Sequence, residues 1–334
     1  MNAGRSPDRP EMRHLYKGMF TDGTRWSRFE HQPGEIFVCT PPKCGTTWTQ
    51  AICALLVFQR PDLDVNPAEI SPWFDSTLVP LDEVVERLRG QAHRHVIKTH
   101  TPLDGIPYFE DARYVVVYRD PRDVFFSLRN HVDNMKLDLP KTALETSPAE
   151  AFHRWLEAGF QPGEDQGPSL AGLVHHYETF RSHAHLPNIE LYHYSDLKRD
   201  LLGEMKRMAD HLDIEVAPEL ISRLAETASF ENMRRNAERF APGTERGLWQ
   251  DSTRFFNRGT IGQWRDELTP DDDARFRERL ASMLPDQEAR WLIGGSGDPS
   301  TATGPDSSTT SPEEAAAGPT RPPRPADLAP PADG

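Results

Sequence analysis

Four short apolar segments, separated by long stretches with helical patterning, constrain the fold of this chain more than any other feature. They cover residues 35–40, 94–99, 112–118 and 188–194. Continuous apolar runs of this length are typical of strands buried on both faces of a parallel sheet. Helices are predicted between and after them, at residues 46–60, 120–132, 195–212, 217–228 and 269–284. The alternation predicts an α/β fold in which a central parallel sheet is flanked by helices on both faces.

Basic and polar residues follow the ends of these predicted strands. Residues 43–48, residues 98–100, Arg119 and Tyr194 all stand at such positions. Ligands of parallel α/β folds bind beyond the carboxyl ends of the strands. One edge of the sheet is therefore the predicted functional site. At the helix starts, Asp120 is the predicted N-cap before Pro121, and Ser195 is the predicted N-cap of the helix that follows the fourth strand.

The segment TPPKCGTTWTQ, which follows the first strand, has the features of an anion-binding loop. Gly45 allows the backbone to approach a ligand, and the amides up to Trp48 open a helix whose dipole favours negative charge. Lys43 adds a positive charge, and Thr46 and Thr47 add hydroxyl donors. An ordinary strand-to-helix turn with a solvated lysine is the alternative.

The same loop does not match the nucleoside-triphosphate pattern, which requires Gly-x-x-x-x-Gly-Lys-Ser/Thr. The lysine here precedes the glycine. The one strand that ends near an aspartate, Asp120, places Arg119 beside it, and that charge opposes a divalent cation.

Three further segments contain candidate functional residues, and each segment also has a purely structural interpretation. Lys98 and His100 alternate around Thr99, so both point to one face, and histidine is a suitable general base near neutral pH. The guanidinium of Arg119 can bind a phosphate in a bidentate manner, with Ser127 two helical turns later. The alternatives are a satisfied structural histidine and a capped helix with surface arginines. A late loop contains Arg258, Gly259 and Gly262, and a surface turn explains it equally well.

Composition limits the partners and the compartment. A net charge of −14 argues against general binding to nucleic acid or to anionic membranes, although a basic pocket for a small polyanion stays compatible with it. The three cysteines, Cys39, Cys44 and Cys53, fit no zinc pattern and indicate reduced thiols in a cytoplasmic protein. No signal peptide or 18-residue apolar run is evident.

Composition also divides the chain into three parts. Residues 1–15 are predicted to be a loose N-terminus and residues 16–293 the folded domain. Residues 294–334 are rich in Pro, Ser and Ala, contain no aromatic residue, and are predicted to be a disordered tail.

Six collinear segments together resemble the cytosolic-type sulfotransferases, which use 3′-phosphoadenosine 5′-phosphosulfate (PAPS). They are PKCGTTW (42–48), KTH (98–100), the Arg-x-Pro-x-Asp-x-x-x-Ser-like run 119–127, YSDLK (194–198), SFENMRRN (229–236) and NRGTIGQW (257–264). The resemblance covers about residues 35–270 and implies the P-loop-like fold of that family. It also implies PAPS as sulfonate donor and 3′,5′-ADP (PAP) as product, with no metal.

Carried over position by position, the resemblance implies His100 as general base with Lys43 and Lys98 as the other catalytic residues. The residues it implies for the donor nucleotide are Lys43, Cys44, Gly45, Thr46, Thr47, Trp48, Arg119, Ser127, Tyr194, Phe230, Arg258 and Gly259.

Three positions depart from the family pattern. Cys44 stands where the family has a serine thought to interact with the catalytic lysine and restrain premature hydrolysis, so the thiol puts that coupling in doubt. Asn257 replaces an arginine, and Ala228 replaces a threonine that contacts the nucleotide. The family's short C-terminal dimer motif is not evident near 265–285, so the oligomeric state stays open.

The predicted acceptor is a hydroxyl group of a glycolipid or of a small phenol or alcohol, because SPWFDST (71–77) and KTHTPLDGIP (98–107) resemble actinobacterial glycolipid sulfotransferases. An apolar acceptor pocket is predicted from Trp73, Phe74, Pro102, Leu103 and Phe109, with core packing of the aromatic residues as the alternative. Residues 159–168 are a predicted lid. The rival functions are a P-loop kinase and a non-catalytic nucleotide-binding protein.

Overall fold

The computed structural model describes residues 9–63, 66–136, 146–164, 167–243, 247–256 and 259–296. Asn257, Arg258, the first eight residues and most of the predicted tail lie outside these ranges. The strands are β1 (Lys17–Gly18), β2 (Thr21–Asp22), β3 (Ile36–Cys39), β4 (Val96–Thr99), β5 (Arg113–Tyr118) and β6 (Ile189–His193).

The α-helices are α1 (Thr46–Phe58), α2 (Pro67–Ile70), α3 (Leu81–Arg89), α4 (Pro121–Asn134), α5 (Pro148–Glu157), α6 (Leu170–Arg181), α7 (Tyr194–Arg199), α8 (Leu201–His211), α9 (Pro218–Thr227), α10 (Phe230–Arg235), α11 (Ala237–Phe240), α12 (Pro270–Ala281) and α13 (Asp286–Gly294). Short 3₁₀ turns are η1 (Gly23–Arg28), η2 (Leu103–Gly105), η4 (Ser252–Phe256) and η5 (Gln263–Asp266).

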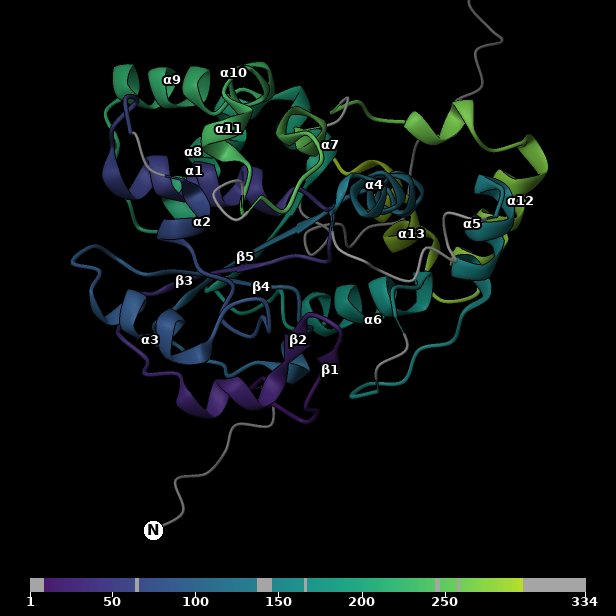
Figure 1. Ribbon diagram of the computed structural model, residues 1–334, viewed down its shortest axis with the longest axis horizontal. Helices are drawn as coiled ribbons and strands as arrows, with labels where there is room; N and C mark the ends of the chain where they lie inside the picture. Colours follow the sequence, from purple (N-terminus) through teal and green to yellow (C-terminus); the bar gives the residue numbers. More distant parts are fainter. Residues whose placement is uncertain are drawn as a thin grey trace, which may run out of the picture. The chain divides into compact units, whose positions relative to one another are not determined.

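The four predicted strands form one parallel sheet in the order β4-β3-β5-β6. Alternate side chains of each strand enter two separate apolar clusters. In β3, Phe37 and Cys39 join one cluster, whereas Ile36 and Val38 join the other. Helices cover both faces, with α1, α8 and α9 on one side of the strands and α3 and α6 on the other (Figure 1). The predicted α/β architecture is therefore confirmed.

Two helix predictions need correction. The helix expected over 195–212 is divided into α7 and α8 at Asp200, whose carboxylate accepts a hydrogen bond from the amide of Gly203 and starts a new helix there. The N-cap of α7 is His193 rather than Ser195, because Nδ1 of His193 accepts a hydrogen bond from the backbone amide of Ser195. The Asp120 cap and Pro121 at the first position of α4 are as predicted.

A small hairpin near the N-terminus was not predicted. Strands β1 and β2 pair in an antiparallel manner, and Thr21 bridges to Ser76 beyond them. This pairing fixes the N-terminal segment against residues 71–77, which lie beside the end of β4 through the Trp73–Lys98 bridge.

Candidate active site

The loop after β3 has a backbone that places its glycine and lysine in unusual conformations. Lys43 has a φ of 70° and Gly45 a φ of 107°, both in the left-handed region. A side chain at Gly45 would also lie 3.0 Å from the ring of Tyr194. Gly45 caps α1, whose first amides have no partners within the helix. The arrangement presents backbone donors at a helix start beside a lysine, which suits an anion.

Within the loop, the hydroxyl oxygens of Thr40 and Thr46 lie 2.6 Å apart. Cys44 has no exposed surface and packs in the apolar cluster with Phe37 and Tyr118. Burial raises the pKa of its thiol to about 12, so the sulfur stays protonated. Its backbone amide donates to the carbonyl of Pro41 at 3.3 Å. This geometry argues against direct contact between the thiol and a ligand in the loop.

Lys98 and His100 stand at the end of β4 as predicted, turned away from Thr99. The hydroxyl of Thr99 is buried and donates to Asp75 at 2.9 Å, whereas Lys98 and His100 keep partly exposed side chains. The indole ring of Trp73 lies below the ammonium group of Lys98, 4.3 Å from it, and 4.7 Å from the His100 ring.

His100 is held in one tautomer. Its Nδ1 lies 2.7 Å from the backbone carbonyl of Thr40, and because a carbonyl only accepts, Nδ1 must carry the proton. Burial, followed by the charge of Lys98, lowers the pKa of His100 well below its usual value. The ring is therefore neutral near pH 7 with the lone pair on Nε2, which is the state that a general base requires.

The two lysines are close enough to influence each other. Burial, followed by the charges of Arg119 and Lys98, lowers the pKa of Lys43 to about 7. Burial lowers the pKa of Lys98 to about 8, although Asp75 opposes this shift. Two lysines whose pKa values are lowered therefore lie beside a neutral imidazole. A bound polyanion would stabilise their ammonium forms, so the site suits such a ligand.

Asp75 supports this cluster and was missed from the sequence. Its carboxylate is fully buried and accepts the hydroxyls of Thr99 and Thr101, at 2.9 and 2.6 Å. Burial raises its pKa against the effect of those two bonds. The residue therefore fixes the end of β4 on both sides of His100.

Arg119 connects the anion loop to two distant segments. Its guanidinium lies 4.5 Å from the centre of the Tyr194 ring and donates to the carbonyl of Thr260 at 3.1 Å. Asp123 is 3.7 Å away. Among the described residues, its Nε is buried without a hydrogen-bond partner. This unpaired, buried donor lies where it can bind an anionic group.

Aromatic residues from three elements surround the start of α1. Trp48 packs edge-on against Tyr194, with ring centres 5.3 Å apart, and donates its indole N–H to the carbonyl of Ala228 at 2.7 Å. Phe230 covers Gly259, where a side chain would meet the phenyl ring at 2.1 Å. Ser127 lies on α4 with a partly exposed side chain, and Arg258 falls outside the described residues.

The structure also brings a residue to Lys43 that sequence reasoning missed. Nδ1 of His131, on α4, lies 2.9 Å from the Lys43 ammonium nitrogen. Burial, followed by the charge of Lys43, lowers the pKa of His131 well below its usual value. The ring is therefore neutral, and its Nδ1 accepts a hydrogen bond from the Lys43 ammonium group. Phe255 and Trp249 pack against the His131 ring, at 5.7 and 4.8 Å between ring centres.

Of the five residues predicted to line the acceptor pocket, only Trp73 has its side chain beside the proposed catalytic residues. Trp73 stands beside Lys98 and His100 with some exposed surface. Phe74 and Leu103 are buried core residues, each 1% exposed. Phe109 precedes β5, stacks on His31 with ring centres 3.8 Å apart, and packs against the core cluster that contains Phe37. Pro102 is buried as well, so core packing is the better interpretation for the other four.

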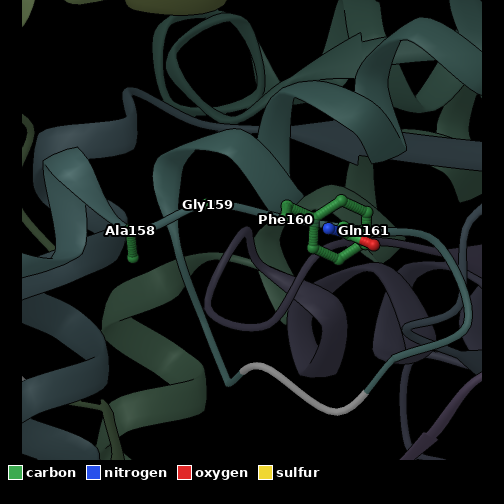
Figure 2. Close-up of a pocket in the computed structure, with 4 residues that line it drawn as sticks. All are labelled: Ala158, Gly159, Phe160 and Gln161. Atoms are coloured by element: carbon green, nitrogen blue, oxygen red, sulfur yellow. The ribbon is translucent and has the colours of Figure 1, made fainter.

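A pocket of about 450 Å³ lies at the predicted lid, lined by Ala158, Gly159, Phe160 and Gln161 (Figure 2). The ring of Phe160 packs against Tyr16 and His175, with ring centres 6.4 and 5.1 Å apart. The lid segment thus adjoins the N-terminal segment rather than standing free.

The fold and the cationic edge define an α/β enzyme built around a phosphate-type anion loop. A family model described as a sulfotransferase domain matches residues 33–287. A glycolipid sulfotransferase of Mycobacterium bovis is 35% identical over 310 residues, covering 85% of this chain and 95% of the relative. An amine sulfotransferase of Oryctolagus cuniculus is 26% identical over 278 residues, with 79% and 85% covered. The chain belongs to the sulfotransferase family and is an enzyme of that class.

Solved structures agree on the fold. Mouse sulfotransferase SULT7A1 complexed with PAP has a TM-score of 0.65 at 21% identity, covering 84% of this chain and 98% of that one. Retinol dehydratase in complex with androsterone and PAP has a TM-score of 0.63 at 21% identity, with 78% and 83% covered. The P-loop-like fold is therefore confirmed. Within the described ranges, no helix combines the length and the apolar character needed to cross a bilayer.

Proposed function

We propose that this sulfotransferase moves a sulfonate group from PAPS to a hydroxyl of a glycolipid or similar lipid-like acceptor. The observation that supports the proposal most strongly is that the neutral imidazole of His100 lies with Lys43 and Lys98 at the anion loop. Relatives named glycolipid sulfotransferases, 35% identical over 85% of the chain, support the acceptor class. Two proteins of the same fold, solved in complex with PAP, support the donor.

The residues present fit this donor. The 5′-phosphate is assigned to the loop, where Gly45 leaves no room for a side chain and Thr46, Thr47 and Trp48 open the helix. The buried Nε of Arg119 is an available donor for the 3′-phosphate, which the proposal also assigns to Ser127 and Arg258. The aromatic rings of Trp48, Tyr194 and Phe230 then border the adenine, with Gly259 beside them.

In the proposed reaction, Nε2 of His100 takes the proton from the acceptor hydroxyl. The oxygen then forms a bond to sulfur while the bond from sulfur to the bridging phosphate oxygen breaks, and 3′,5′-ADP leaves. Lys98 and Lys43 stabilise the negative charge on the sulfonate and on the leaving oxygen, in a site that burial has desolvated. Asp75 is a positioning residue, since it contacts Thr99 and Thr101 on either side of the base.

This assignment predicts a pH dependence for the free enzyme. A lysine whose pKa is lowered loses its positive charge as the pH rises through that value, about 7 for Lys43 and about 8 for Lys98. The value of kcat/KM for PAPS is therefore expected to fall as the pH rises from 7 to 9. Steady-state kinetics with a saturating acceptor measure it. A profile that rises across this range contradicts the assignment of these two charges.

The contact between Lys43 and His131 leads to a second expectation. The proposal transfers the Lys43 ammonium group from His131 to the donor, so the contact competes with donor binding. The variant His131→Phe keeps a ring against Trp249 and Phe255 but removes the acceptor. It is expected to bind 3′,5′-ADP and PAPS about two- to twelvefold more tightly, since such a bond contributes roughly 0.5–1.5 kcal/mol.

Isothermal titration calorimetry measures this difference in affinity. His93→Phe is the matched control, because His93 packs on Phe58 and bonds to the carbonyl of Arg94, away from the loop. Unchanged or weaker binding by His131→Phe shows that the contact persists in the donor complex.

The proposed compartment is the cytoplasm. Cys39, Cys44 and Cys53 are all free thiols buried in the apolar clusters, a pattern that suits a reducing environment.

Ligand-dependent thermal stability tests the donor assignment and separates it from the rival kinase function. We expect 3′,5′-ADP to raise the melting temperature in the absence of divalent cations. A rise with ATP and magnesium but none with 3′,5′-ADP favours a kinase. Binding of 3′,5′-ADP without any transfer to lipid, phenol or alcohol acceptors favours a non-catalytic nucleotide-binding protein.

A further inference from the structure

The largest exposed apolar side chains of the described residues gather in one region. Five such residues are exposed by more than a third of their surface, and three of them, Met12 (46%), Leu15 (48%) and Met19 (56%), lie within eight positions of the chain. A fourth, Leu78 (39%), is brought beside Met19, because its neighbour Thr77 bonds to the carbonyl of Met19 at 3.1 Å. We call residues 9–19 with Leu78 the N-terminal strip.

The strip differs in charge from the rest of the chain. The whole sequence carries a net charge of −14, whereas residues 9–19 contain the basic residues Arg9, Arg13 and Lys17 against one acidic residue, Glu11. All four of these side chains are exposed. Apolar and basic side chains therefore alternate along one exposed segment, which is the composition that binds the surface of an anionic bilayer.

The strip is fixed to the catalytic side of the domain. The amides of Arg13 and His14 donate to the carbonyl of Asp104, at 2.6 and 3.0 Å. The hydroxyl of Tyr16 donates to the Asp104 carboxylate at 2.9 Å, and His175 lies 3.0 Å from both groups. Asp104 follows His100 by four positions, so the strip is held beside the segment that carries the proposed base.

The hairpin that follows the strip makes a second contact on the same side. The amide of Asp22 donates to the carbonyl of Asp75 at 2.8 Å, and Asp75 positions the end of β4. The pocket that Phe160 lines (Figure 2) adjoins the strip, because the Phe160 ring stacks on the ring of Tyr16. A molecule held in a bilayer against the strip would therefore lie near both the pocket and the segment that carries His100.

We infer that the N-terminal strip is a docking surface for an anionic lipid bilayer, at which the enzyme collects a lipid-anchored acceptor. The inference rests on the proposed function for the acceptor, but binding to the bilayer is a separate property. A bilayer is favoured over a protein partner because the strip is a line of separate side chains. Apolar insertion with basic contacts to headgroups requires no matching surface shape.

Vesicle flotation of the full chain tests the inference. We expect wild-type protein to float with phosphatidylcholine vesicles that contain phosphatidylglycerol. It is expected to float much less with phosphatidylcholine alone, and to be released from the anionic vesicles by high salt. The double variants Leu15→Ser with Met19→Ser, and Arg13→Glu with Lys17→Glu, are each expected to reduce the bound fraction about tenfold.

Matched controls separate this surface from general exposure. Ile261→Ser removes an apolar side chain that is 45% exposed elsewhere, and Lys206→Glu reverses an exposed charge on α8. Both are expected to float as the wild type does. The strip variants are expected to keep the wild-type affinity for 3′,5′-ADP, which also shows that they fold.

Three outcomes overturn the inference: wild-type protein that does not float, strip variants that float as well as wild type, and controls that lose binding equally. A change in oligomeric state of the strip variants on gel filtration also contradicts it, by showing a protein interface. Vesicle binding without transfer to lipid would leave the docking surface intact and contradict the proposed acceptor. Transfer to dispersed lipid without vesicle binding would support the proposed acceptor and contradict the docking surface.

Discussion

Replacement of His100 by alanine is expected to reduce sulfonate transfer by a factor of 10² to 10⁴, the usual contribution of a general base. The reason is specific to the geometry. Nδ1 is engaged with the Thr40 carbonyl, which leaves Nε2 as the only ring atom able to take a proton. Burial and the Lys98 charge keep the imidazole neutral, so it is ready to act at neutral pH.

The same variant is expected to keep its affinity for 3′,5′-ADP, because the proposal gives His100 no contact with the nucleotide. Transfer is measured by release of 3′,5′-ADP and affinity by calorimetry. His93→Ala is a control at a distant histidine. Transfer by His100→Ala at more than about a hundredth of the wild-type rate rules out the general-base role.

Replacement of Lys43 by methionine is expected to reduce transfer by about 10² to 10³, the range found when one preorganised donor to a developing charge is removed. Methionine keeps much of the length but lacks the positive charge, including the charge that lies 5.0 Å from the centre of the Phe255 ring. Unlike the histidine variant, this one is also expected to bind PAPS more weakly, since the charge acts on the donor before the reaction as well.

Single-turnover rates at saturating PAPS separate the two effects of the Lys43 change. Lys206→Met, an exposed lysine on α8, is the matched control. A loss of less than about tenfold in the single-turnover rate would move the charge-stabilising role to Lys98 and away from the loop.

The sheet and the main edge of the site were predictable because they depend on local sequence patterns. Each strand is a continuous apolar run, and both of its faces are buried by helices, so its pattern does not depend on the neighbouring strand. Once the strands are known to be parallel, their carboxyl ends bring Lys43, Lys98 and Arg119 to one edge.

The groups that support the site were not predictable, because their contacts join distant parts of the chain. Asp75 bonds to Thr99, 24 positions later, and His131 meets Lys43 across 88 positions. A histidine on a helix face has no local signal that shows its partner. The division between α7 and α8 had the same origin, since it depends on whether Asp200 caps a new turn or continues the old one.

The aromatic residues of the predicted acceptor pocket show a different limit. Trp73 and Phe74 are adjacent aromatic residues, yet only the Trp73 side chain lies beside the Lys98 ammonium group, while the Phe74 ring packs against Trp26 with ring centres 4.8 Å apart. Outside a regular strand or helix, the sequence has no period that assigns each side chain to a face.

The central claim is tested most directly by incubating the protein with PAPS that carries radiolabelled sulfur and a lipid extract presented in anionic vesicles. The account predicts label in a lipid product that mass spectrometry identifies as a sulfonated glycolipid, formed together with 3′,5′-ADP and absent with His100→Ala. Release of labelled inorganic sulfate alone, or label transferred equally by His100→Ala, would contradict it.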